Sequence, residues 1–162
     1  MRSISQYLSC VAAMAFLAAL APASLRAGNH TDTAEGPDYR QAVQLIDAAL
    51  LEVTKGGVAS AKQKEAFFRE LRKAEQLLEK ASDDASKEVD ALEAHGKRDS
   101  ALWSATAELA LTCAFAKDSL GLAADRGRAG DWKSALELVK EQASNLREAK
   151  VTVLQETKKA GV

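Results

Sequence analysis

Residues 60–96 read SAKQKEAFFRELRKAEQLLEKASDDASKEVDALEAHG, and this stretch decides the fold. Its apolar residues return every three or four positions in one heptad phase, which places them on one face of a helix. Because the phase continues through the polar residues 82–84, we predict one helix that runs to about His95 and ends before Gly96. The members of its stripe are Phe67, Leu71, Ala74, Leu78, Ala81, Ala85 and Leu92.

Three further stretches have the same helical spacing. One follows Pro37, a residue that the first turn of a helix tolerates. Another begins at Asp99 or Ser100, either of which can cap it, and the last begins after Asp131. Short turns between four amphipathic helices predict an all-α fold, an antiparallel up-down-up-down four-helix bundle, over residues 38–160.

The helix that begins near Ser100 is the most apolar of the four. We expect it to end at a turn made by Gly127 and Gly130. Its other faces also carry large apolar side chains, and a helix that is apolar nearly all round is expected to be buried. We therefore expect little of it, Leu111 and Phe115 included, to face water. Its main stripe holds Leu102, Ala105, Leu109, Cys113, Ala116, Leu120 and Ala123.

The start of the chain predicts export. Arg2 is the only charge before an apolar run at residues 11–20, and small residues at the spacing of a cleavage site follow it. The run has about ten residues, whereas a membrane-spanning helix needs about twenty. We predict a signal peptide at residues 1–27, a flexible lead at 28–37, and a location that is periplasmic in a bacterium and otherwise secreted.

The charge of the chain after residue 27 is mildly acidic. Two of the 22 basic residues, Arg2 and Arg26, lie in the predicted signal peptide, which leaves 20 against 23 acidic residues. A nucleic-acid-binding protein needs a clustered basic surface, so this balance argues against that class. We expect no nucleic-acid partner and no membrane association once the signal peptide is cleaved.

Few side chains after residue 27 could serve a metal, a cofactor or catalysis. The histidines are His30 and His95, far apart in the sequence, and the single cysteine is Cys113. Neither the haem-attachment pattern Cys-x-x-Cys-His nor the di-iron pattern Glu-x-x-His is present. Cys113 lies on a predicted core stripe, where burial makes a thiol unreactive. We therefore expect no metal, no cofactor and no catalytic residue.

A surface on the helix of residues 60–96 is the remaining candidate for function. Phe67 and Phe68 are about 100° apart around a helix, so both cannot face one narrow stripe. Phe68 is therefore either a rim residue of the core or an anchor for a partner. Because the first helix is only half as long, part of this helix is uncovered. We predict a partner surface at Phe68, Arg72, Asp84 and Glu88.

These observations favour a non-enzymatic role. We expect an exported helical bundle that serves as a protein-binding, scaffold or accessory module, with another protein or a second copy of the chain as its partner. The alternative is a carrier or sensor that holds a small apolar ligand between its helices. Core stripes made mostly of alanine and leucine allow close packing, which leaves little room for such a ligand.

Overall fold

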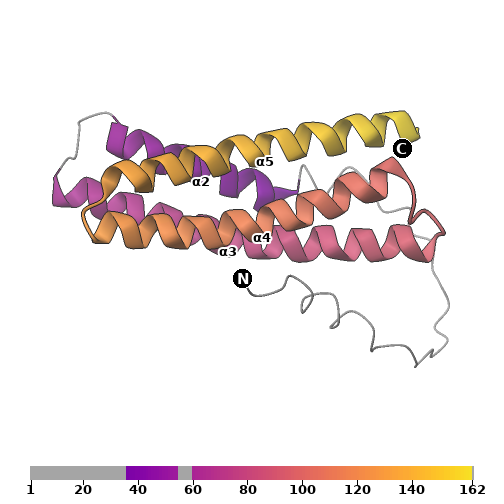
Figure 1. The fold of residues 1–162 in the computed structure, drawn as a ribbon, viewed down its shortest axis with the longest axis horizontal. Helices are drawn as coiled ribbons and strands as arrows, with labels where there is room; N and C mark the ends of the chain where they lie inside the picture. The colour runs from indigo at the N-terminus through magenta and orange to yellow at the C-terminus, as the bar shows by residue number, and fades with distance from the viewer. Residues whose placement is uncertain (1–35, 55–59, 162) are drawn as a thin grey trace, which may run out of the picture.

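The computed structural model describes residues 36–54 and 60–161. These residues form a bundle of helices and contain no strand, which confirms the predicted all-α class (Figure 1). The predicted signal peptide at 1–27 and nearly all of the lead at 28–37 lie outside the described residues. The four helices are α2 (Pro37–Thr54), α3 (Ala61–Ala94), α4 (Ala101–Arg128) and α5 (Trp132–Ala160).

The long helix α3 is continuous from Ala61 to Ala94, as its single heptad phase predicts. At its start, the side-chain oxygen of Gln63 accepts hydrogen bonds from the backbone N–H and the hydroxyl of Ser60, at 3.1 Å and 3.0 Å. All seven residues of its predicted stripe are buried. The predicted stripe of α4 is buried as well, and Cys113 within it is fully enclosed.

The turn between α4 and α5 differs from the prediction at Gly127. This residue lies buried inside α4, which continues to Arg128, and only Gly130 has the positive φ, +91°, of a turn glycine. A Cβ atom at position 127 would lie 3.1 Å from the ring of Phe68, so glycine is what lets this ring approach α4 so closely. Asp131 caps α5 by accepting a hydrogen bond from the Ser134 N–H at 3.2 Å.

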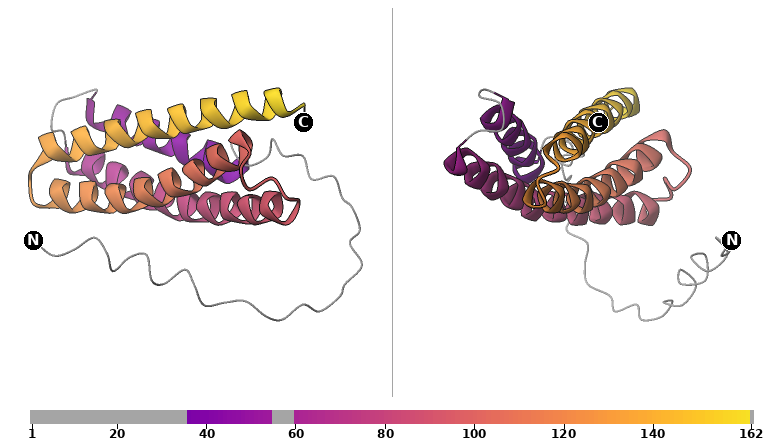
Figure 2. Two further views of the ribbon diagram at one scale, coloured as in Figure 1. Left: turned by 45° about the vertical axis from the view of Figure 1, so that its right-hand side comes forward. Right: turned by 60° about the vertical axis from the view of Figure 1, so that its left-hand side comes forward.

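Helices α3 and α4 pack along their lengths, and α2 and α5 lie on the same side of this pair (Figures 1 and 2). Contacts join the early part of α3 to the late part of α4, as between Phe68 and Gly127. Farther along α3, the Ser82 hydroxyl donates to the Ala110 carbonyl, near the early part of α4, at 2.9 Å. None of the described helices has the length and apolar character that crossing a membrane requires.

Helix α2 is short and covers only part of α3. It has 18 residues against 34 in α3, which correspond to about 27 Å and about 51 Å at 1.5 Å per residue. It packs mainly on α3 and only lightly on α5. Its link to α5 includes a hydrogen bond from the Tyr39 hydroxyl to the Leu146 carbonyl and an ion pair between Asp47 and Arg147.

We expect amide hydrogens in residues 82–95 to exchange with solvent before those in residues 64–78 of α3. The later segment buries only Ala85 and Leu92, whereas the earlier one buries Phe67, Leu71, Ala74 and Leu78. Less buried apolar area makes local opening less costly. Hydrogen–deuterium exchange read by mass spectrometry measures the order. Equal protection of both segments would contradict the expectation that buried apolar side chains stabilise the early part of α3 more than its late part.

Candidate functional site

Large apolar side chains on the outward face of α4 are open to solvent. Leu111 is 61% exposed, Phe115 is 68% exposed and Leu122 is 47% exposed. The expectation that α4 is buried nearly all round is therefore wrong on this face. The reason is that α4 packs mainly against α3 on one flank and α5 on the other, which leaves its third side without a packed helix among residues 36–54 and 60–161. At 100° per residue, these three side chains lie within about 40° of one another, so they form one stripe.

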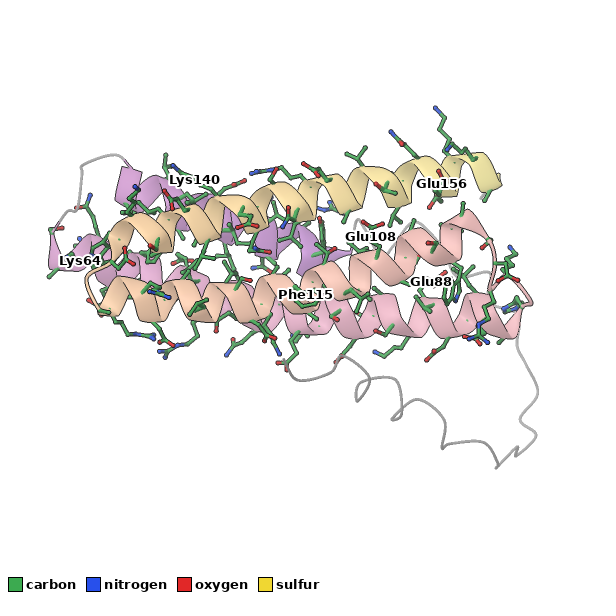
Figure 3. The ribbon with its side chains drawn as sticks, in the orientation of Figure 1. Lys64, Glu88, Glu108, Phe115, Lys140 and Glu156 are labelled. Atoms are coloured by element: carbon green, nitrogen blue, oxygen red, sulfur yellow. The ribbon has the colours of Figure 1, made fainter. Side chains whose placement is uncertain are left out.

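A groove of about 470 Å³ runs beside Phe115, between α4 and α5. Figure 3 shows Phe115 and Glu108 on α4, with Glu108 nearer the start of the helix. We call this surface, together with the stripe of Leu111, Phe115 and Leu122, the α4–α5 face; Leu122, at the far edge of this face, also lines a groove between α3 and α4. The groove is lined from α4 by Glu108, Thr112, Phe115 and Ser119, and from α5 by Gln142, Asn145, Glu148, Ala149 and Thr152.

Some polar side chains in this groove lack a hydrogen-bond or ion-pair partner within the described residues. Gln142 is only 6% exposed, and within residues 36–54 and 60–161 no group forms a hydrogen bond with its amide. Glu148 accepts a hydrogen bond from the Ser144 hydroxyl at 3.3 Å. No cationic side chain in the described part of the chain pairs with Glu108 or Glu148. The groove therefore presents carboxylates and an amide to whatever enters it.

A second groove, between α3 and α4, differs in its charges. It measures about 480 Å³ and contains a lysine as well as acidic residues. Lys117 lies 3.7 Å from the carboxylate of Glu79 and 3.6 Å from that of Asp118. Lys117 thus partly neutralises the acidic groups of this second groove. The groove beside Phe115 has no lysine or arginine among its lining residues.

The four residues of the predicted partner surface do not lie together. Phe68 and Arg72 line one shallow depression on the outer side of α3. Asp84 follows Phe68 by sixteen residues, so it lies about 160° from Phe68 around the helix axis. Glu88 lies about 160° from Phe68 in the opposite direction. Asp84 is exposed and pairs with Lys87 at 2.8 Å, whereas Glu88 is half-buried. The structure brings the first two together and separates them from the other two.

Phe68 belongs to an aromatic cluster where α3 begins and the α4–α5 turn passes. Its ring centroid lies 5.5 Å from that of Phe67 and 5.6 Å from that of Trp132, and Phe67 and Trp132 are also 5.5 Å apart. The guanidinium of Arg128 lies over the Phe68 ring at 5.2 Å, a cation–π distance. These contacts favour the interpretation of Phe68 as a rim residue of the core.

Cys113 and Tyr39 are buried in the interior. Burial raises the pKa of the Cys113 thiol to about 12, so the thiolate needed for nucleophilic attack is scarce near neutral pH. Burial, reinforced by the nearby Cys113 and partly offset by Arg147, also raises the pKa of the Tyr39 hydroxyl above its ordinary range. Across residues 36–54 and 60–161, no three His, Cys, Asp or Glu side chains are placed to hold a metal ion.

We expect the bundle to lose stability as the pH rises above about 8.5, where thiols of the unfolded chain begin to deprotonate. The folded state holds the Cys113 proton to about pH 12, so alkaline solution favours the unfolded chain between these values. The loss from Cys113 should reach about 2 kcal/mol at pH 10. Urea unfolding at pH 7.5 and at pH 10 measures it.

The matched control for this loss is Cys113→Ala, which has no thiol to titrate. Its stability should fall less between the two pH values than that of the wild-type chain. Tyr39→Phe should likewise reduce the loss at still higher pH. Equal losses in the wild type and in Cys113→Ala would contradict the burial of the thiol.

Comparisons with protein-family models, with curated proteins and with solved structures found no match to this chain.

Proposed function

We propose that this chain is an exported, non-enzymatic helical bundle that binds another protein through its α4–α5 face. The observation that carries the proposal is the 68% exposure of Phe115 beside a groove. Aromatic side chains are enriched in protein interfaces, where a few such anchors supply most of the binding energy. Contiguous apolar surface that the fold itself does not bury marks an interaction site more often than an isolated apolar residue does.

Two features of the sequence complete the proposal. The signal peptide at residues 1–27 would deliver the chain to the periplasm or outside the cell, where the partner must also be. The up-down-up-down order of the helices would set α4 beside α5 along their lengths and so form the groove. The opposite order of contact partners along α3 and α4 supports this topology.

The alternative, a carrier of a small apolar ligand, has weaker support. Pockets for such ligands are lined predominantly by apolar and aromatic side chains. The groove beside Phe115 is lined instead by hydroxyl, amide and carboxylate groups, with Phe115 and Ala149 as its apolar members. This lining suits a protein surface better than a hydrocarbon.

Capture from the exported fraction of the native host tests the proposal. Three forms of the chain purified from that fraction are immobilised. They are the wild type, the double variant Leu111→Ser with Phe115→Ser, and the control variant Leu51→Ser. Leu51 is the matched control, because it is an apolar residue of α2 that is 49% exposed. We expect a protein that the wild type and the control retain and the double variant loses. Equal retention by all three would contradict a role for the α4–α5 face.

N-terminal sequencing of the same purified chain tests its export. The proposal predicts a start near Ser24 or Gly28. A chain from the exported fraction that still begins at Met1 would contradict cleavage of the signal peptide.

A further inference from the structure

The groove beside Phe115 carries negative charge and no positive charge. Two of its nine lining residues, Glu108 and Glu148, are acidic, and none is lysine or arginine. Neither carboxylate has a cationic partner within the described part of the chain. Charges on a binding partner complement such a potential, because like charges brought together destabilise a complex. The groove therefore selects for a cationic group.

Gln142 adds a hydrogen-bonding group to the same groove. The residue is 6% exposed and lines the groove, and its side-chain amide forms no hydrogen bond within residues 36–54 and 60–161, so this amide is available to an incoming group. The side-chain oxygen of Gln142 accepts from an N–H group. A guanidinium or an ammonium is both a cation and an N–H donor, so either can pair with the carboxylates and donate to Gln142.

The apolar stripe beside the groove indicates the shape of the partner. Leu111, Phe115 and Leu122 follow one line along α4, with spacings of four and seven residues. A helix laid along this line presents side chains at the same spacing, three, four and seven residues apart. An extended strand repeats every second residue and does not match it.

We infer that the partner segment is an amphipathic helix whose apolar residues cover Leu111 and Phe115 and whose lysine or arginine side chains enter the groove. This inference rests on the proposed binding role of the α4–α5 face. A second copy of the chain fits less well. A two-fold contact through the same face would bring Glu108 and Glu148 of one copy close to the same acidic residues of the other.

Two synthetic helical peptides of about 18 residues test the inference. Both carry leucine at helical spacing on one face, and the other face carries lysine in one peptide and glutamate in the other. Fluorescence anisotropy with the chain purified from the exported fraction measures binding. We expect the lysine peptide to bind at least about tenfold more tightly than the glutamate peptide, with an affinity that falls as salt is added.

Paired variants locate the binding. Glu108→Gln with Glu148→Gln should weaken the lysine peptide by at least about tenfold, the effect of losing about 1.4 kcal/mol. Asp83→Asn with Asp90→Asn is the matched control, because it removes the same charge from exposed positions on α3. This control should change the affinity less than about twofold. Equal binding of both peptides, or an equal loss in both double variants, would overturn the inference.

The remaining outcomes separate this inference from the proposed function. Sedimentation that finds a dimer in the wild type and a monomer in Phe115→Ala would identify a second copy as the occupant and overturn the inference. If capture depends on Phe115 but the lysine peptide does not bind, the face binds a protein of other chemistry and only the inference fails. If capture does not depend on Phe115, the proposed function fails as well.

Discussion

Replacing Phe67 with alanine is expected to lower the free energy of unfolding by about 3–5 kcal/mol. The Phe67 side chain is fully buried and stands edge-on to the rings of Phe68 and Trp132, each 5.5 Å away. Its removal leaves a cavity where α3 meets the α4–α5 turn, and it also removes the two aromatic contacts. Urea unfolding followed by circular dichroism measures the loss.

The control is the same chemical change at Phe115. This side chain is 68% exposed, so Phe115→Ala should change the free energy of unfolding by less than about 0.5 kcal/mol. Similar losses for the two variants would contradict the burial assigned to these phenylalanines.

Phe115→Ala is expected instead to weaken binding of the captured partner by at least about 30-fold, which corresponds to the roughly 2 kcal/mol of an interface hot spot. The reason is that Phe115 is the largest exposed apolar side chain on the α4–α5 face and stands at the rim of its groove. Titration of the purified partner into each variant measures the change.

Leu51→Ala provides the comparison for this effect. Leu51 is 49% exposed on α2, and its replacement should change the affinity less than about twofold. A partner that binds Phe115→Ala as tightly as the wild type would show that this face does not bind it.

The helices and their buried faces could be predicted from the sequence because the information is local. A 3.6-residue period sets which side chains share a face, and all seven predicted stripe residues of α3 are buried. Helix capping is also local. Of the two candidates at the start of α4, Ser100 is the one that caps it, accepting from the Trp103 N–H at 3.1 Å.

The exposed face of α4 was not predicted, because burial depends on how many neighbours a helix has. Phe115 follows Cys113 by two residues and so points about 200° away from it around the helix. In a bundle where α4 packs against α3 and α5, that direction faces water. The position of Phe115 around the helix follows from the sequence, but its apolar side chain led to the expectation that it is buried.

The groove could not be predicted because its residues come from two helices. Glu108 is 34 positions from Gln142 and 40 from Glu148 in the sequence, and they line one groove because α4 and α5 pack together. Gly127 illustrates the same limit. As a glycine it suggested a turn, but it is needed inside α4 for the approach of Phe68, a contact between residues 59 positions apart.

Photo-crosslinking in living cells tests the central claim, that the α4–α5 face binds another protein, most directly. A photoreactive phenylalanine analogue replaces Phe115 in one strain and Leu51 in another, both of them exposed positions. The account predicts that irradiation links the chain to one specific protein from position 115 and not from position 51. No adduct from position 115, or the same adduct from both positions, would contradict it.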